Sequence, residues 1–324
     1  MSDAAGDIGS LVAGAIALEK WPLAQLVRRF EDPRPEAVAE KAAAIAALEA
    51  HGARPRAMVA GFTGTPGSGK STLVGELAGR LIARDPAATV AVLAIDPSSH
   101  RSGGSILGDR TRVHFPIGER RLYFRSQPSD RELGGMGRAT YPVVRLLERL
   151  FDTVFVETVG IGQSEIEIER LADRVYLVLQ PLGGDQIQFM KAGIMEVPHA
   201  FILNKCDVGA AARRSYHALR ASIDFARPGE PAPPPIFRTS AISGEGLDDV
   251  LNDLVEHRTV HDEAARSQRD RYFLEKWVRD EYGRFGLTLL ERQGGAANLL
   301  ERAGSFEAAQ AAYRAPCDPS PSAE

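Results

Sequence analysis

The sequence of 324 residues contains only two cysteines, Cys206 and Cys317, which stand far apart in unlike contexts. Two such residues do not make a disulfide framework, and they suit a reducing compartment. No run approaches the ~20 consecutive apolar residues that a membrane-spanning helix requires. The apolar stretch Leu11–Leu18 is short and has no basic segment before it, so a signal peptide is not expected. These absences predict a cytoplasmic protein that has no membrane partner.

The sequence also lacks an excess of positive charge. Its 39 Lys and Arg residues are opposed by 43 Asp and Glu residues, which gives a net charge of −4. Proteins that bind nucleic acid through its phosphates normally carry a basic excess, so no nucleic-acid partner is expected. With 44% hydrophobic residues, the chain can form one large core with extensions or two small domains.

Apolar periodicity divides the chain into three parts, namely residues 1–57, 58–258 and 259–324. In the first part, four apolar residues within Leu23–Phe30 recur at helical spacing, and a second helix is predicted over Pro35–Ala50. This N-terminal helical extension either packs as a collar on the next domain or serves as a partner-binding arm. The last part is predicted to be helical as far as Ala315 and to end in a disordered tail.

The middle part alternates short apolar runs with helical stretches. Several of these runs lack polar alternation, as expected of strands that are buried on both faces of a parallel sheet. Helices between parallel strands imply crossover connections, so the predicted fold is α/β with a doubly wound, mostly parallel sheet. The predicted strands are Met58–Thr63, Val90–Ile95, Arg121–Arg125, Thr153–Glu157, Arg174–Leu179, His199–Asn204 and Ile236–Thr239.

A phosphate-binding loop follows the first of these strands. The segment GTPGSGKS, from Gly64 to Ser71, matches G-x-x-x-x-G-K-[ST] at every fixed position, and a helical stretch follows it. Glycines allow backbone N–H groups to surround phosphate oxygens, and the helix N-terminus adds partial positive charge. Lys70 is expected to reach the β- and γ-phosphates, and the Ser71 hydroxyl to ligate Mg²⁺. The residues predicted to bind the nucleotide here are Gly64, Thr65, Pro66, Gly67, Ser68, Gly69, Lys70, Ser71 and Thr72.

The segment from Asn204 to Asp207 has the N-K-x-D arrangement at the end of an apolar strand. A carboxylate at Asp207 can accept hydrogen bonds from the N1–H and the exocyclic amine of guanine, whereas adenine offers no such pair. Lys205 is expected to lie along the base, while Asn204 braces the loops. The S-A element after the next strand is expected to contact guanine O6, so GTP and GDP are favoured over ATP. The predicted base-site residues are Asn204, Lys205, Asp207, Ser240, Ala241 and Ile242.

Three acidic residues are candidate ligands of Mg²⁺ together with Ser71. Asp96 and Glu157 end predicted strands, and Asp109 lies in the segment GDRT. Carboxylates at the carboxyl ends of strands face the crevice where open α/β sheets bind ligands. Because Mg²⁺ takes one or two carboxylates together with phosphate oxygens and waters, not all three need to contact the ion. For Asp109, a surface salt bridge is the alternative interpretation.

Hydrolysis is predicted to depend on Lys70, Glu157 and Gly160, which we take as the catalytic candidates. Gly160 stands where a backbone N–H senses the γ-phosphate. The next residue, Ile161, occupies the place where a Ras-type GTPase has its water-orienting glutamine, and its side chain forms no hydrogen bond. Slow intrinsic hydrolysis is therefore expected, and residues 58–258 are predicted to be a P-loop GTPase domain.

Four longer segments are similar to the signature segments of one family, the GTPases associated with methylmalonyl-CoA mutase (MeaB/ArgK type). They have the sequences DPSS, GSILGDRTR, ETVGIGQSE and GDQIQFMKAGIME, and they occupy residues 96–99, 104–112, 157–165 and 184–196. The resemblance covers about Leu11 to Val255.

The resemblance implies a G-protein chaperone for an adenosylcobalamin-dependent acyl-CoA mutase. Such proteins gate the loading of the cofactor and protect or reactivate the mutase. Within a segment that resembles the family's switch, Asp185, Gln188 and Lys191 are the candidate switch residues, with a solvated helix start as the alternative. The C-terminal part resembles the family's dimerisation arm and implies a homodimer. Its aromatic pattern would look the same in an intrachain core.

The sequence departs from the family pattern at several places. Pro128-Ser129 is followed by Asp130-Arg131 instead of Arg-Gly, and Cys206 replaces a smaller residue. These departures leave open whether the mutase is of the methylmalonyl-, isobutyryl- or 2-hydroxyisobutyryl-CoA type. One alternative is a metallochaperone GTPase, although the sequence has no compact Cys/His cluster for a soft metal. The other is a small-molecule or protein kinase, against which the guanine-reading motif argues.

Overall fold

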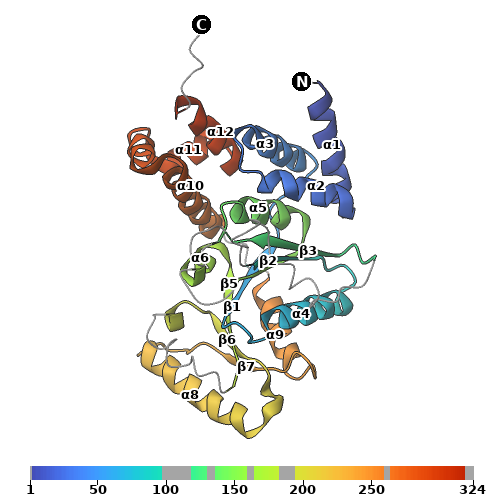
Figure 1. Cartoon of the computed structure of the whole chain (residues 1–324), viewed down its shortest axis with the longest axis vertical. Helices are drawn as coiled ribbons and strands as arrows, with labels where there is room; N and C mark the ends of the chain where they lie inside the picture. The colour runs from blue at the N-terminus through green and yellow to red at the C-terminus, as the bar shows by residue number, and fades with distance from the viewer. Residues whose placement is uncertain are drawn as a thin grey trace, which may run out of the picture. The chain divides into compact units, whose positions relative to one another are not determined.

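The computed structural model describes residues 2–96, 118–129, 136–158, 164–181, 194–258 and 263–317. The chain forms two compact units (Figure 1). The first, which we call the sheet unit, contains residues 56–137 and 151–260. The second, the helical unit, contains residues 1–55, 138–150 and 261–324. Among the described residues, no helix is both long enough and apolar enough to cross a membrane.

The sheet unit is built on seven parallel strands in the order β3-β2-β4-β1-β5-β6-β7 (Figure 1). Every residue of β1, β2, β4, β5 and β6 is buried, which explains why these strands show no polar alternation. The prediction of a parallel α/β sheet is confirmed. The strands are β1 Met58–Gly64, β2 Val90–Asp96, β3 Leu122–Pro128, β4 Thr153–Glu157, β5 Arg174–Leu179, β6 Ala200–Leu203 and β7 Ile236–Arg238.

The predicted strand ends lie within one residue of the observed ones, except at the end of β3. The strand predicted to end at Arg125 continues to Pro128, because residues 122–128 pair in register with β2 over its whole length. Of the three added residues, Ser126 is partly buried, Gln127 is buried and Pro128 is exposed, so they form no apolar run that would mark a strand.

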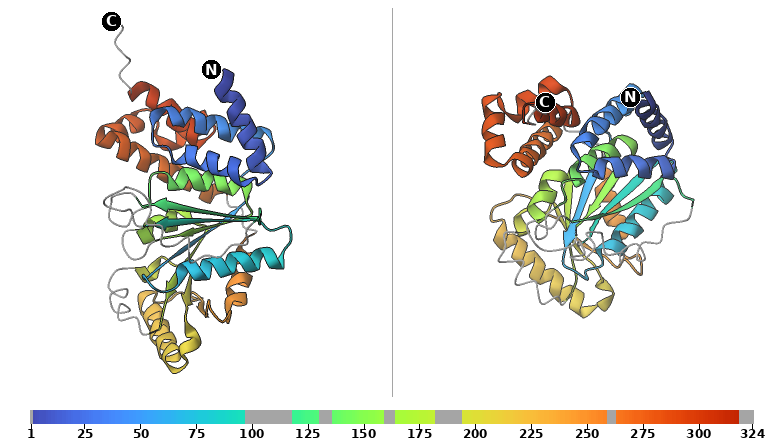
Figure 2. Two further views of the ribbon diagram at one scale, coloured as in Figure 1. Left: turned by 45° about the vertical axis from the view of Figure 1, so that its right-hand side comes forward. Right: turned by 45° about the horizontal axis from the view of Figure 1, so that its top comes forward.

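Helices cover both faces of the sheet within this unit. On one face, α4 (Lys70–Arg84) and α9 (Leu247–His257) pack with Phe62 in one core cluster. On the other face, α8 (Ala210–Ala226) packs with Phe201. The same face of β1 carries Gly61, where a Cβ would lie 2.6 Å from Ile168 of α6 (Ser164–Leu171). The right view of Figure 2 shows α6 and α8 on one side of the strands, and α4 and α9 on the other. Two short 3₁₀ helices, η1 (Ile194–Glu196) and η2 (Cys206–Val208), flank β6.

The helical unit combines both ends of the chain with one helix from its middle. Helix α5 (Thr140–Leu150) lies in the sequence between β3 and β4, yet it is grouped with the terminal helices. Its Arg145 is buried and pairs with Glu307, at 2.9 Å between Nε and Oε1, and with Asp270. The other helices of this unit are α1 Ser2–Ile16, α2 Lys20–Glu31, α3 Pro35–Ala50, α10 Glu263–Arg292, α11 Gly295–Ala303 and α12 Phe306–Cys317.

The helices predicted near both ends of the chain are present. Helix α3 has the predicted bounds, whereas α12 ends at Cys317, two residues beyond the predicted helical end. In the C-terminal part, Trp277 and Tyr282 both pack edge-to-face on Tyr313, with ring centroids 6.1 and 5.5 Å apart. An intrachain core therefore accounts for part of the aromatic pattern. The homodimer stays a prediction.

Candidate functional site

The loop between β1 and α4 holds the predicted phosphate-binding motif. Gly64, Gly67 and Gly69 have φ angles of +137°, +79° and +86°, which side-chain-bearing residues rarely adopt. A Cβ at Gly64 would lie 2.0 Å from the carbonyl oxygen of Val178, and one at Gly69 would lie 2.6 Å from Asn204 Nδ2. At Gly64 and Gly69, both the backbone and the neighbouring segments therefore require glycine.

Lys70 and Ser71 begin α4, at the helix end that carries partial positive charge. Lys70 Nζ donates hydrogen bonds to the carbonyl oxygens of Gly64 (2.9 Å) and Thr65 (3.0 Å), so the ammonium group is held at the loop. In the same loop, the hydroxyl oxygens of Thr65 and Ser68 are buried and have no hydrogen-bond partner in the described structure. Since buried polar groups are normally paired, this loop fits a site that takes an oxygen-rich anion such as a phosphate.

Two carboxylates end neighbouring strands beside this loop. Ser71 Oγ donates a hydrogen bond of 2.7 Å to Glu157 Oε1 at the end of β4. Ala94 pairs with Glu157 between β2 and β4, so Asp96, two residues further on, lies on the same face of the sheet. The side chain of Asp96 is buried and accepts a hydrogen bond from Ser126. The donor atoms of Ser71, Asp96 and Glu157 are all oxygens, which is the set that Mg²⁺ prefers.

Asn204, after β6, connects the phosphate loop to the segment that follows β7. Its Nδ2 donates to the carbonyl oxygen of Ser68 at 2.8 Å. Its Oδ1 accepts from the Ala241 N–H at 3.1 Å and from the Thr239 hydroxyl at 3.2 Å. Because this amide is only 1% exposed, water does not compete for these bonds, and one side chain holds both loops together.

The remaining residues of the predicted base site lie around this bridge. Lys205 has a φ of +63°, and its Nζ donates to the carbonyl oxygen of Gly67 at 2.6 Å. Asp207 is exposed, and Ile242 is 90% exposed. By contrast, Ser240 and Ala241 are buried. The structure thus gathers the N-K-x-D and S-A segments next to the phosphate loop and leaves a carboxylate and an apolar side chain open to solvent.

Cys206, between Lys205 and Asp207, is a free thiol whose burial raises its pKa, while the Arg238 guanidinium lowers that pKa in part. Its Sγ donates to the carbonyl oxygen of Leu203 at 3.0 Å. The residue that departs from the family pattern thus packs inward and is not presented to a ligand.

Sequence reasoning missed two side chains at this site. Gln180 Oε1 accepts a hydrogen bond of 3.0 Å from Lys205 Nζ. The sequence did contain an indication that Gln180 belongs to the site. Gln180 is a polar residue directly after β5, just as Asn204 is a polar residue directly after β6. Ser126, which bonds Asp96, has no such signal, since only the pairing of β3 with β2 brings it there.

Several predicted residues lie outside the described part of the chain. They are Asp109, the catalytic candidate Gly160 with its neighbour Ile161, and the switch candidates Asp185, Gln188 and Lys191. Their roles stay predictions.

A parallel sheet with helices on both faces, a G-x-x-x-x-G-K-S loop between β1 and α4, and N-K-x-D after β6 together define a P-loop GTPase. The family model described as "Methylmalonyl Co-A mutase-associated GTPase MeaB" matches residues 23–282. The chain belongs to this family, as the sequence resemblance predicted, and it is a GTPase.

Curated relatives agree with this assignment, and one solved structure agrees with the fold. A "Putative GTPase" of Caulobacter vibrioides is 35% identical over 283 residues, which cover 85% of each chain. The "Methylmalonic aciduria type A homolog, mitochondrial" of Caenorhabditis elegans is 34% identical over 223 residues, or 67% of this chain and 56% of that relative. A crystal structure described as "LAO/AO transport system kinase" matches 96% of this chain and 98% of its own, with a TM-score of 0.65. At 23% identity, that match shows the fold alone.

Proposed function

We propose that this GTPase is a G-protein chaperone that gates adenosylcobalamin loading and protects or reactivates a B12-dependent acyl-CoA mutase. Membership of a family described as mutase-associated supports the partner class. The observation that supports a nucleotide-dependent switch is the set of hydrogen bonds by which the Asn204 side chain joins Ser68 to Ala241, which we call the Asn204 bridge. Because one buried amide joins the phosphate loop to the base loop, a nucleotide that contacts both loops acts on a single connected unit.

In this proposal, the phosphates lie in the loop from Gly64 to Thr72, where backbone N–H groups and Lys70 supply positive charge. The guanine base lies beside Lys205 and Ile242, with O6 toward the Ser240-Ala241 segment, which Asn204 Oδ1 holds through the Ala241 N–H. Asp207, being exposed, accepts from the N1–H and the exocyclic amine of the base. An adenine nucleotide leaves this carboxylate without those two bonds, which is the physical basis of the preference.

Mg²⁺ fits the donor set of Ser71, Glu157 and Asp96, which would hold it directly or through water. When bound, the ion supplies positive charge to the phosphate oxygens during hydrolysis. Lys70 holds a second positive charge at the loop. Slow intrinsic hydrolysis, the homodimer and the cytoplasmic location stay predictions from the sequence.

The nucleotide assignment is tested by two substitutions and a control. Lys70→Ala should abolish tight binding of GTP and GDP, because it removes the ammonium group held at the phosphate loop. Asp207→Asn should reduce the preference for guanine over adenine nucleotides while keeping the shape of the side chain. Asp224→Asn, at an exposed position near the end of α8, is the control and should change neither. Unchanged GTP binding in both test variants, measured by calorimetry, would refute the site.

The chaperone role is tested by mixing the full chain with adenosylcobalamin-dependent mutases of the methylmalonyl-, isobutyryl- and 2-hydroxyisobutyryl-CoA types. Complex formation and the rate of mutase inactivation are compared with GDP and with a non-hydrolysable GTP analogue. We expect a nucleotide-dependent effect on one of them, which the Lys70→Ala variant should lack. If no mutase responds to either nucleotide state, the chaperone proposal fails, while the GTPase assignment stands.

A further inference from the structure

Gln180 directly follows β5, at the edge of the sheet where the phosphate loop and the base loop lie. Leu179, the last residue of β5, pairs with Leu203, the last residue of β6, so Gln180 stands level with Asn204. The proline after Gln180 disfavours a helical backbone there, so the chain leaves β5 extended. Side chains of an extended chain alternate between the two faces, which puts Gln180 on the face of Val178, where α4 packs.

Lys205 is the residue that Gln180 contacts. Its Nζ donates hydrogen bonds to Gln180 Oε1 at 3.0 Å and to the carbonyl oxygen of Gly67 at 2.6 Å. Its backbone has a φ of +63°, which residues with a side chain rarely adopt. Its stem passes beside the phosphate loop, because a Cβ at Gly69 would lie 3.7 Å from Lys205 Cε. The turn thus fixes the backbone of Lys205, and two oxygen acceptors fix its ammonium group.

The two acceptors order a side chain that is otherwise flexible. A lysine carries its charge on a four-carbon stem, and fixing that stem costs conformational entropy. A stem that the chain's own acceptors already hold can contact a base without paying this cost on binding. Without Gln180 Oε1, Gly67 would be the one described acceptor left to the ammonium group, and the stem would be less well ordered.

We propose that Gln180 is a positioning residue for guanine-nucleotide binding, and that its Oε1 holds the Lys205 ammonium group so that the lysine stem forms one side of the base site. This inference rests on the proposed placement of the base beside Lys205. It ties together the ends of three adjacent strands, since Gly67 follows β1, Gln180 follows β5 and Lys205 follows β6. Because the role belongs to an oxygen acceptor, a carboxylate at position 180 should replace the amide.

The alternative is that Gln180 only supports the fold. Among the described residues, its side chain hydrogen-bonds to Lys205 alone, and it is half-buried. Asn204 differs from it, because that buried amide bonds backbone groups of two loops. Loss of the Gln180 acceptor should therefore change nucleotide affinity more than the free energy of unfolding.

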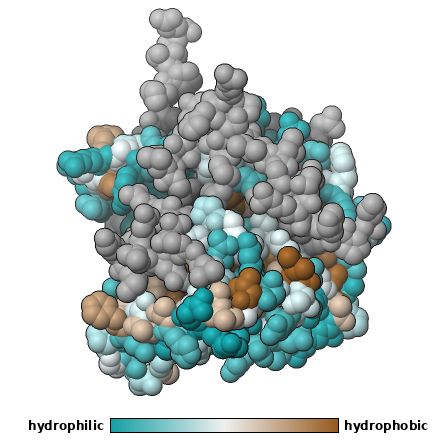
Figure 3. Space-filling model, turned by 60° about the horizontal axis from the view of Figure 1, so that its bottom comes forward, coloured by the Kyte–Doolittle hydropathy of each residue, from teal (hydrophilic) through white to brown (hydrophobic). Residues whose placement is uncertain are grey.

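Few exposed apolar side chains are available to contact a base. The large ones that the structure describes in the sheet unit are Val208, Phe225 and Ile242, of which Ile242 belongs to the predicted base site. On the molecular face in Figure 3, apolar residues form separate spots among hydrophilic ones. Lysine stems readily cover apolar surface while the charge stays outside it. An ordered Lys205 stem therefore adds apolar contact area to that of Ile242.

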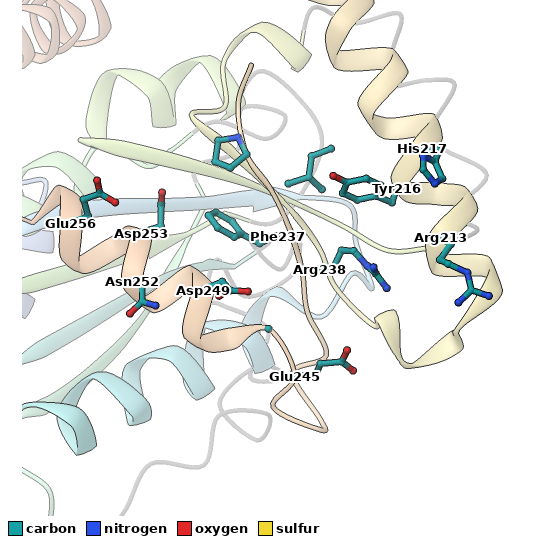
Figure 4. Close-up of a pocket in the computed structure, with 13 residues that line it drawn as sticks. Arg213, Tyr216, His217, Phe237, Arg238, Glu245, Asp249, Asn252, Asp253 and Glu256 are labelled. Carbon is teal, nitrogen blue, oxygen red and sulfur yellow. The ribbon is translucent and has the colours of Figure 1, made fainter. Parts of the chain in front are cut away.

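A groove of ≈ 970 Å³ elsewhere in the sheet unit is separate from this site (Figure 4). It lies along β7 between α8 and α9, and residues of these elements and of the turn before α9 line it. Neither Gln180 nor Lys205 is among its lining residues. A molecule in this groove would not touch the Lys205 stem, so an effect of Gln180 on nucleotide affinity reports on the base site.

Two substitutions of similar size separate the acceptor from the shape of the side chain. Gln180→Met removes the oxygen, whereas Gln180→Glu keeps an oxygen acceptor opposite the ammonium group. Calorimetry with GDP should give a Kd at least about fivefold higher for Gln180→Met, because a hydrogen bond to a charged group is stronger than one between neutral groups. For Gln180→Glu, the Kd should stay within about twofold of the wild type. Gln268→Met, at an exposed position of α10, is the matched control and should bind as the wild type does.

A double-mutant cycle tests whether Gln180 acts through Lys205. Lys205→Met removes the ammonium group and should weaken GDP binding at least as much as Gln180→Met does. In the Lys205→Met background, adding Gln180→Met should change the Kd by less than about twofold, because no donor is left for Gln180 to hold. Inorganic pyrophosphate, which has no base, should bind Gln180→Met within about twofold of its affinity for the wild type.

The outcomes separate this inference from the proposed base site. If Lys205→Met leaves the GDP affinity within about twofold of the wild type, the proposed placement of the base fails and this inference fails with it. If Lys205→Met weakens GDP binding but Gln180→Met does not, the inference alone is overturned. Equal losses for GDP and pyrophosphate would assign Gln180 to the phosphate loop, and equal losses in Gln180→Met and Gln180→Glu would assign it to packing. Either result would also overturn the inference.

Discussion

Replacement of Asn204 by alanine should weaken both the fold of the sheet unit and nucleotide binding. The side chain makes three hydrogen bonds, of 2.8, 3.1 and 3.2 Å, and it is 1% exposed. With a net contribution of roughly 0.5–1.5 kcal/mol for each bond, the expected loss in the free energy of unfolding is about 2–4 kcal/mol. The buried carbonyl oxygen of Ser68 and the N–H of Ala241 lose a partner in the variant, which puts the loss toward the upper end of this range.

Thr239→Val is the matched control for this substitution. It removes one of the three bonds, at a buried position, and keeps the shape of the side chain. It should therefore cost about 1 kcal/mol. Asn204→Asp keeps the acceptor toward Ala241 and Thr239 but buries a carboxylate that faces the Ser68 carbonyl oxygen, so its loss should be at least as large as that of Asn204→Ala.

Two measurements test the reasoning. Urea denaturation of the nucleotide-free chain gives the change in the free energy of unfolding, and binding of a fluorescent GDP analogue gives the affinity. Asn204→Ala should lower the affinity at least about tenfold, the equivalent of 1.4 kcal/mol, because both loops of the site lose their common support. The bridge would be refuted if Asn204→Ala cost no more than Thr239→Val and left the GDP affinity within about twofold of the wild type.

Three further predictions concern other parts of the chain. Gly69→Ala should weaken GDP binding far more than Gly67→Ala, because both positions have φ near +80° but only at residue 69 does a Cβ meet a neighbour, at 2.6 Å; equal affinities by calorimetry would contradict this. Glu307→Ala should cost about 3–5 kcal/mol in urea denaturation, because it leaves the buried Arg145 with one fewer carboxylate, and replacing both residues by Met should recover much of this loss. The pKa of Asp32 is lowered from 3.8 to about 2, chiefly by a side-chain hydrogen bond from the arginine two residues later. Since this folded-state pKa is lowered, the stabilisation is present above about pH 4 and is lost as the pH falls toward 2; an NMR titration midpoint near 3.8 would show the reasoning to be wrong.

Most elements of the sheet unit could be predicted from the sequence, because its central strands are short, apolar and bounded by glycine, proline or polar residues. The pattern failed where a strand was not fully buried. The last three residues of β3, Ser126, Gln127 and Pro128, form no apolar run, and they are in a strand because β2 supplies a partner of the same length.

In the helical unit, the local sequence pattern also fails to predict where one element packs. The amphipathic pattern marks α5 as a helix, but nothing local says that it groups with the chain ends and not with the strands on either side of it. In the structure, the buried Arg145 guanidinium meets Glu307, a residue 162 positions away in the sequence, and Tyr141 packs on Phe273 and Phe306. A buried ion pair between such distant residues leaves no periodic trace in either segment.

The sequence by itself determined the chemistry of this protein. The phosphate loop and the N-K-x-D segment are contiguous motifs whose function depends on local backbone conformation and on side chains within eight residues, so they can be recognised before the chain is folded. Only the tertiary structure decided how these motifs are joined. The Asn204 bridge, the contact of Gly69 with that amide and the Ser126 bond to Asp96 each depend on strand order. Strand order is set by long-range packing, and no single segment encodes it.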